Sequence, residues 1–217
     1  MEKFKLTRGE KAWILYDVGN SAFILLVSTI IPIYFNALAA GEGISDSDYL
    51  AAWGYAGSVS TLLVAVSSPL LGTLADRRNM KPILFVASLI LGALGCACLG
   101  FAWGWVSFLV IFVIAKVGYS SANVFYDAML PEITTESRMD KVSSLGYAFG
   151  YIGSCIPFIL SLVVVLFYER FGISQTTAML IAFLITTVWW VGLTIPLLRT
   201  YRHTAYSETS GTKISET

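Results

Sequence analysis

Six apolar runs, each long enough to cross a lipid bilayer, most constrain the fold of this 217-residue chain. A transmembrane helix needs about 20 mostly apolar residues to cross a hydrocarbon core of about 30 Å. The connections are short, so consecutive helices are expected to be antiparallel neighbours. We predict an all-α membrane protein with a cytoplasmic segment at 1–12, a six-helix bundle over 13–198 and a polar tail at 199–217. The predicted helices cover 13–35, 50–71, 82–101, 105–129, 144–168 and 176–198.

The composition excludes several classes of protein. Charged residues make up 13% of the chain, whereas they make up about 25% of a soluble domain. The 14 basic and 14 acidic residues cancel, so the net charge suggests no nucleic-acid partner. The three cysteines lie within apolar runs, which favours small buried side chains over a disulfide framework or a metal site. We expect a lipid bilayer around the chain and no cofactor or metal.

The basic residues predict the orientation. Of the 14 lysines and arginines, 12 lie before the first run, in the second and fourth connections or after the last run. Arg170 lies on the opposite side, and Lys116 lies within the fourth run. Because cytoplasmic loops are enriched in Lys and Arg, both termini are predicted to be cytoplasmic, with the cell membrane as the location. A cleavable signal peptide ending near 37–39 is the alternative for the first run, but that run exceeds about 15 residues and contains Asp17.

Three formally charged residues lie within the predicted helices: Asp17, Lys116 and Asp127. A charge at the bilayer centre costs about 2.5–3.5 kcal/mol on insertion scales, and such residues usually face a bundle interior or a wet cavity. Asp17 and Asp127 lie near helix ends, where the membrane interface would also accommodate them. Lys116 lies near the middle of its helix, so it is the hardest of the three to explain by snorkelling.

Polar residues extend these positions into two stripes. At 100° per residue, Lys116, Asn123 and Asp127 fall on one face of the fourth helix. Two polar faces on otherwise apolar helices indicate that both face something other than lipid. We predict that they bind a solute or an ion; the alternative is a structural pairing of the two stripes, because buried charges mostly pair. The stripes consist of Asp17, Asn20 and Ser21 on the first helix and Lys116, Ser120, Asn123 and Asp127 on the fourth.

The two helices also show a weak mirror relation. Each carries a Tyr-Asp pair, at 16–17 and at 126–127, with an asparagine about one turn deeper. The first helix is predicted to run outward and the fourth inward, so both pairs are expected at cytoplasmic depth. Two inverted three-helix repeats would produce this relation.

The connection between the second and third helices reads Gly-Thr-Leu-Ala-Asp-Arg-Arg-Asn-Met-Lys-Pro over 72–82. Gly72, Asp76, Arg77 and Lys81 match the loop signature Gly-x-x-x-Asp-Arg-x-Gly-Arg-Lys/Arg of the major facilitator superfamily, which this chain resembles. The resemblance implies that the loop helps to latch the cytoplasmic ends of two transporter halves, so these four residues are predicted to form a gating loop. A basic cytoplasmic loop whose aspartate caps the third helix would explain the charges. It would not explain why the glycine lies at the position that the signature requires.

The loop departs from the signature at two positions. Asn79 replaces the usual glycine, which is tolerable because Asn can adopt a left-handed conformation. Met80 replaces the usual arginine, so it cannot supply that residue's ion pairs in the loop. Stretches at 13–23, 32–35, 125–133 and 143–153 narrow the resemblance to the branch related to the vacuolar amino-acid effluxer, whose bacterial members are often called unknown major facilitators.

The resemblance covers helices one to six, whereas members of that family have twelve helices in two halves with the substrate between them. We expect either a fragment or a half-transporter that pairs with a second six-helix half, which would be a C-terminal half or another protomer. Transport by a lone six-helix monomer is improbable, because alternating access rocks one half against the other. The resemblance implies amino acids or other small metabolites as solutes, with protons or ions as coupling species.

Three functions from different classes follow. The leading interpretation is a secondary-transporter half without enzymatic chemistry, in which Lys116 meets a substrate carboxylate and Asp17 or Asp127 meets a proton or an amine. The alternative is a membrane-embedded enzyme in which Lys116 activates Ser120, one turn away, as a general base. No oxyanion-hole motif or metal-ligand set accompanies that pair. A third interpretation is a non-transporting assembly partner of another membrane protein.

Overall fold

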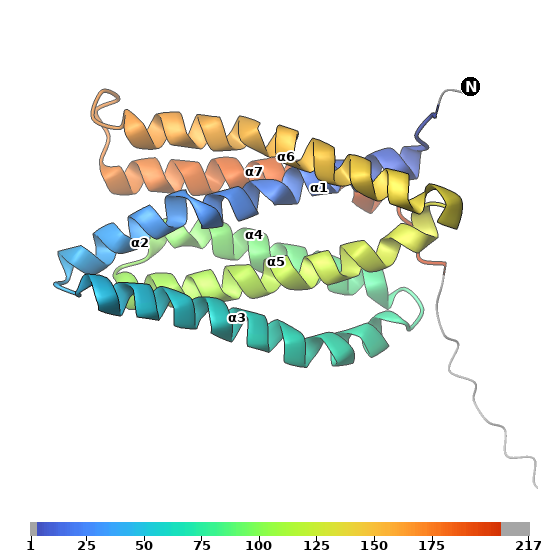
Figure 1. Cartoon of the computed structure of the whole chain (residues 1–217), viewed down its shortest axis with the longest axis horizontal. Helices are drawn as coiled ribbons and strands as arrows, with labels where there is room; N and C mark the ends of the chain where they lie inside the picture. The colour runs from blue at the N-terminus through green and yellow to red at the C-terminus, as the bar shows by residue number, and fades with distance from the viewer. Residues whose placement is uncertain (1–3, 205–217) are drawn as a thin grey trace, which may run out of the picture.

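The computed structural model describes residues 4–204. Six helices in this range are long and apolar enough to cross a membrane, which confirms the predicted all-α, six-helix architecture (Figure 1). The tail predicted at 199–217 lies outside the described residues from position 205 onward. The elements are α1 (Arg8–Ser28), α2 (Ile30–Gly41), α3 (Asp46–Ala75), α4 (Met80–Cys98), the 3₁₀ turn η1 (Leu99–Phe101), α5 (Trp105–Ile133), α6 (Glu136–Leu166) and α7 (Gln175–Thr200).

The first span is broken into α1 and α2 at Thr29. This residue leaves the helical region of backbone space, with φ −134° and ψ −74°, and its hydroxyl donates to the carbonyl oxygen of Leu25 at 2.5 Å. Pro32 has no N–H with which to bond the carbonyl of Ser28, so the helical ladder is interrupted at this point. The sequence analysis predicts one continuous helix here, because hydropathy does not report backbone breaks.

The helices extend beyond the apolar runs that predicted them, most of all around the connection expected at 130–143. The helix α5 continues to Ile133 and α6 begins at Glu136, so only Thr134 and Thr135 lie outside a helix. Both threonines have extended backbone, with ψ of 166° and 154°. Hydropathy reports the part of a helix that suits lipid, whereas backbone hydrogen bonding continues into its polar ends.

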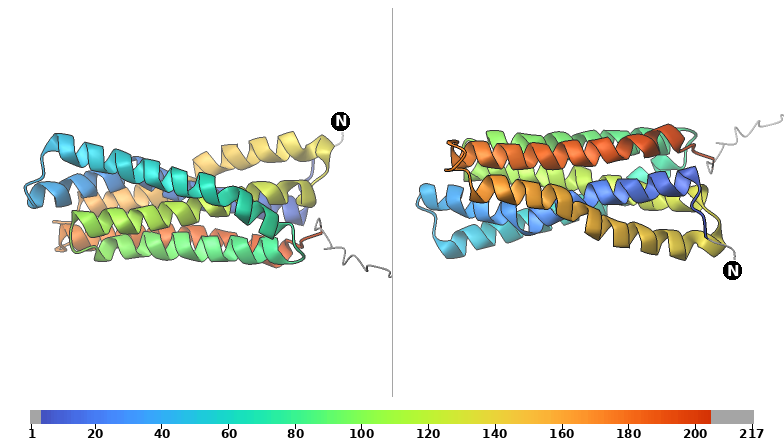
Figure 2. Two further views of the ribbon diagram at one scale, coloured as in Figure 1. Left: turned by 90° about the horizontal axis from the view of Figure 1, so that it is seen from below. Right: turned by 90° about the horizontal axis from the view of Figure 1, so that it is seen from above.

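The bundle has the internal symmetry of two three-helix repeats. The helix α1 packs on α6 and α7, and α5 packs in the same way on α3 and α4, while α4 and α7 contact each other. If α1, α3 and α4 are exchanged with α5, α6 and α7, respectively, each of these contacts maps onto one that is observed. Figures 1 and 2 show α3 and α6 along two long edges of the bundle, with α1, α2 and α5 between them. The spans α3 and α6 are also the least buried.

Glycines permit a close contact between α4 and α5. A Cβ atom added at Gly118 would lie 2.3 Å from the backbone nitrogen of Gly92, and one added at Gly92 would lie 2.9 Å from the nitrogen of Tyr119. Real Cβ atoms do not approach backbone so closely, so both positions require glycine. Small residues at helix contacts let backbones approach, which is how helices associate in lipid.

Candidate functional site

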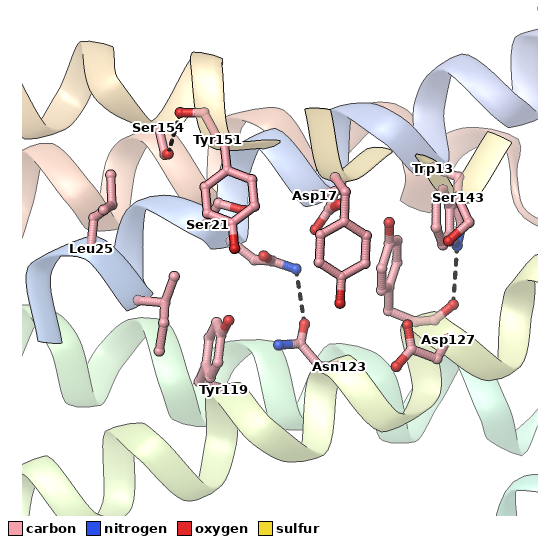
Figure 3. Close-up of a pocket in the computed structure, with 14 residues that line it drawn as sticks. Trp13, Asp17, Ser21, Leu25, Tyr119, Asn123, Asp127, Ser143, Tyr151 and Ser154 are labelled. Atoms are coloured by element: carbon pink, nitrogen blue, oxygen red, sulfur yellow. Dashed lines mark hydrogen bonds between the residues drawn. The ribbon is translucent and has the colours of Figure 1, made fainter. Parts of the chain in front are cut away.

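A cavity of about 270 Å³ lies between α1, α5 and α6 (Figure 3). Its polar groups are two carboxylates, two amides, hydroxyls and an indole, and no basic side chain among the described residues lines it. The cavity therefore holds two acidic side chains without a basic side chain of the described residues beside them. Its lining consists of Trp13, Asp17, Asn20, Ser21, Ile24, Leu25, Tyr119, Asn123, Tyr126, Asp127, Ser143, Tyr147, Tyr151 and Ser154.

An amide contact fixes α1 against α5 at the base of this cavity. The side-chain oxygen of Asn123 accepts a hydrogen bond from the amide of Asn20 at 2.8 Å and a second from the hydroxyl of Tyr16 at 3.2 Å. Asn20 and Tyr16 are buried. A side-chain amide with its oxygen held in this way has a fixed orientation, because both lone pairs are occupied.

Tyr126 contributes a hydroxyl that lacks a partner. Its ring lies between aromatic neighbours, stacked on Trp13 with 4.2 Å between centroids and tilted on Tyr16 at 4.5 Å. Tyr126 is 4% exposed, and its hydroxyl oxygen is buried without a hydrogen bond to any described residue. A buried polar group without a partner is costly. A solute, ion or water in the cavity would relieve this cost.

Asp17 lies against the glycine face of α6. A Cβ atom at Gly146 would come within 3.1 Å of the Asp17 carboxylate, and one at Gly150 within 2.9 Å of the Ser21 hydroxyl. The missing side chains of α6 therefore make room for the polar stripe of α1. Asp17 is half-buried and Asp127 is exposed. Neither carboxylate forms an ion pair with a cation in the range 4–204.

The structure brings together five of the seven residues predicted to bind solute. Asp17, Asn20 and Ser21 face the cavity from α1, and Asn123 and Asp127 face it from α5 (Figure 3). The two stripes touch through their asparagines, but their carboxylates form no ion pair with any residue that the structure describes.

The other two predicted residues lie outside the cavity. The half-buried Lys116 points toward α3 and lines a separate groove, with its Nζ atom 5.9 Å from the centre of the Phe112 ring. Ser120 is half-buried and lines neither space. No hydrogen bond joins Lys116 to Ser120, so the geometry gives no support to a Ser/Lys catalytic pair.

The contribution of α6 to the cavity was not predicted from the sequence. Tyr147, Tyr151 and Ser154 line it from that helix, and the rings of the two tyrosines lie 6.4 Å apart. Their spacing of four and three residues places all three on one helix face. This periodicity was available in the sequence, but tyrosines within an apolar run also suit packing.

The loop residues predicted to control gating lie at one end of the bundle. Gly72 belongs to the last turn of α3, and Asp76 and Arg77 follow it as exposed residues. Lys81 differs, because it is buried and forms an ion pair with Glu132 at the end of α5. Its ammonium also donates to the carbonyl oxygen of Ala128 at 3.3 Å. The pair ties the start of α4 to the end of α5.

The substitution of Asn79 for glycine has the expected structural basis. Asn79 adopts the left-handed conformation, with φ 60° and ψ 7°, directly before α4. Among residues 4–204 it has the only positive φ outside glycine. The conformation that the loop signature needs is therefore kept without the glycine.

A second ion pair at the same end joins the starts of α1 and α6. The guanidinium of Arg138 donates to both carboxylate oxygens of Glu10, at 2.7 and 2.8 Å, and the hydroxyl of Thr134 donates to one of them at 2.6 Å. Glu10 also accepts from the backbone N–H of Thr7 in a capping box. Sequence reasoning did not predict this pair, since its residues lie 128 positions apart.

Six spans built as two three-helix repeats, with polar residues of several spans gathered in one cavity, form the architecture of a secondary-transporter domain. The chain matches the family described as "Vacuole effluxer Atg22 like" over residues 46–215, and it belongs to that family.

Two curated relatives support this assignment. The chain is 38% identical over 200 residues to a protein of Bacillus subtilis (strain 168) named "Uncharacterized MFS-type transporter YxiO", covering 90% of this chain and 47% of the relative. It is 27% identical over 150 residues to an "Uncharacterized protein" of Aquifex aeolicus (strain VF5), covering 68% of this chain and 36% of that protein. The chain thus spans about half the length of the first relative and less of the second.

Proposed function

We propose that this chain forms one half of a secondary transporter that moves a small solute with a positively charged amino group. The observation that carries the proposal is the cavity that holds Asp17 and Asp127 without a basic side chain from residues 4–204. Carboxylates at membrane depth are retained where they meet a counter-charge, a proton or a substrate. An ammonium group satisfies that need, and amino acids or related amines are the solute class that this chemistry favours.

The proposal includes a second six-helix half as partner. The cavity lies between helices on the face bordered by α3 and α6, the two spans with the smallest buried share. Alternating access moves one half of a transporter against the other around a shared site. The partner would be a C-terminal half or another protomer, and it would cover this face.

The setting of the transporter follows from the distribution of basic residues. Twelve of the 14 lysines and arginines lie on one side of the spans, which favours cytoplasmic termini. We propose the cell membrane as the location. The loop formed by Gly72, Asp76, Arg77 and Lys81 then lies on the cytoplasmic side and controls switching rather than solute contact, since it lies at the end of the bundle.

A binding experiment tests the acidic site. The purified chain in detergent is titrated with L-alanine, ethylamine and acetate, and unfolding temperature and heat of binding are recorded. Ethylamine and L-alanine are expected to bind, and acetate is not. Asp17→Asn is expected to weaken amine binding at least tenfold, whereas the matched variant Asp140→Asn, which changes an exposed acid outside the cavity, leaves it unchanged. Equal amine binding by Asp17→Asn and the parent chain would contradict the proposal.

A further inference from the structure

A second space, a groove of about 560 Å³, lies between α3 and α5. Its α3 wall is formed by Leu62 and by the small residues Gly54, Gly57, Ser58, Thr61 and Ala65. A Cβ atom added at Gly54 would meet nothing within 4 Å, and one added at Gly57 would meet only the Nζ atom of Lys116, at 3.9 Å. The ammonium of Lys116 therefore faces open space rather than packed side chains.

Lys116 has no counter-charge within the described chain. Its Nζ atom lies 5.9 Å from the centre of the Phe112 ring, and neither ion pair between described residues includes it. The hydroxyls of Ser58 and Thr61 donate to carbonyl oxygens of their own helix, at 2.9 and 3.0 Å. A lysine near the middle of a membrane span marks a functional site unless it is paired. Lipid phosphates lie about 15 Å from the bilayer centre, too far to be its partner.

Helix geometry sets the distance between this cation and the acidic cavity. Asn123 and Asp127 lie seven and eleven residues after Lys116 on α5, within about 20° of its direction around the helix axis. The groove and the cavity therefore face the same side of α5. At about 1.5 Å per residue, Lys116 is separated from the two cavity residues by about 10 and 16 Å along the helix.

We propose that Lys116 binds the carboxylate of the same solute whose ammonium group occupies the acidic cavity, so that the solute is an elongated zwitterion. The inference rests on the proposed function. An α-amino acid is too short to reach both groups, because one carbon carries both of its charged groups, so it would occupy the acidic cavity alone. An extended peptide gains about 3.3–3.6 Å per residue, so a chain of three or four residues spans the separation. The solute class is a short peptide or a zwitterion of similar length.

The test compares glycine, triglycine and triglycine amide as ligands of the purified chain, with dissociation constants measured by calorimetry. Triglycine is expected to bind at least tenfold more tightly than glycine or triglycine amide, since only triglycine has both charges at the required separation. Lys116→Met is expected to remove that preference and leave the affinity for triglycine amide unchanged. Lys116→Arg keeps the positive charge and is expected to retain most of the preference for triglycine. Unfolding temperatures without ligand confirm that the variants fold.

The outcomes separate this inference from the function on which it rests. Equal affinities of the parent chain for triglycine and triglycine amide overturn the role of Lys116, and this comparison needs no variant. If Asp17→Asn still weakens glycine binding in that case, the acidic site and the proposed function stand. If none of the amines binds, the proposed function fails and the inference fails with it.

Discussion

The indole of Trp13 stacks on the phenol ring of Tyr126 and donates its N–H to the backbone carbonyl oxygen of Tyr126 at 3.1 Å. The two residues are 113 positions apart and join the first span to the fourth, the equivalent helices of the two repeats. Both rings are buried and line the acidic cavity. The contact therefore sets the separation of the two helices that carry the site's carboxylates.

Removal of this contact is expected to destabilise the bundle. Trp13→Ala should lower the free energy of unfolding by about 3–5 kcal/mol, as large-to-small changes at buried aromatic positions do. Trp13→Phe keeps a ring but loses the N–H donor, so the expected loss is smaller, about 1–2 kcal/mol. Denaturation in detergent measures both. Trp103→Ala is the matched control, because Trp103 is 89% exposed; equal effects of Trp13→Ala and Trp103→Ala would argue against a structural role for the stack.

The crossing of α4 and α5 gives a second prediction. Gly118→Ala places a methyl group against the backbone of α4 and should lower the unfolding temperature by several degrees, since the helices must separate. Gly192→Ala is the control on α7, where an added Cβ meets nothing within 4 Å. That change should be neutral or slightly stabilising, because Ala favours the helix more than Gly does. An unfolding temperature of Gly118→Ala at or above that of the parent chain would contradict the close contact.

The buried ion pair between Lys81 and Glu132 supplies a third prediction. Their side chains are 8% and 4% exposed, so removal of either partner breaks a buried ion pair. Lys81→Met and Glu132→Gln should each lower the free energy of unfolding by about 3–5 kcal/mol. The double variant should lose less than the sum of the two, with a coupling of about 1 kcal/mol or more. Additive losses would show that the residues do not act as a pair.

The sequence predicts the spans well because their signal is local. Apolar length and flanking basic residues are properties of each segment, whereas the break at Thr29 depends on backbone geometry that hydropathy does not report. Helical periodicity placed Asn20 and Asn123 on polar stripes of their helices, and the structure joins the two stripes through these asparagines. It could not show that Lys116, on the same stripe as Asn123, lies where α5 faces α3, since one stripe of a long helix can meet different neighbours along its length.

The α6 side of the site illustrates the same limit of local patterns. Asp17 has room beside α6 because Gly146 and Gly150 lack side chains. The small-residue spacing of α6 predicts a close helix contact, but it does not identify the partner helix. Tertiary packing decides which residues lie against the glycines of α6, and the acidic cavity arises from that packing.

The hydroxyl of Tyr126 gives the last prediction, in which stability and binding change in opposite directions. It is buried without a partner among the described residues, and an unsatisfied buried hydroxyl costs about 1–3 kcal/mol. Tyr126→Phe should therefore raise the free energy of unfolding of the ligand-free chain by about 1 kcal/mol or more. The same change should weaken amine binding if the solute completes the hydrogen bond of this hydroxyl.

Tyr55→Phe is the matched control, because Tyr55 is 72% exposed and lies outside the acidic cavity. Chemical denaturation and calorimetry with L-alanine measure the two effects on the same samples. A Tyr126→Phe chain that is less stable than its parent would mean that the hydroxyl already has a structural partner, such as a bound water.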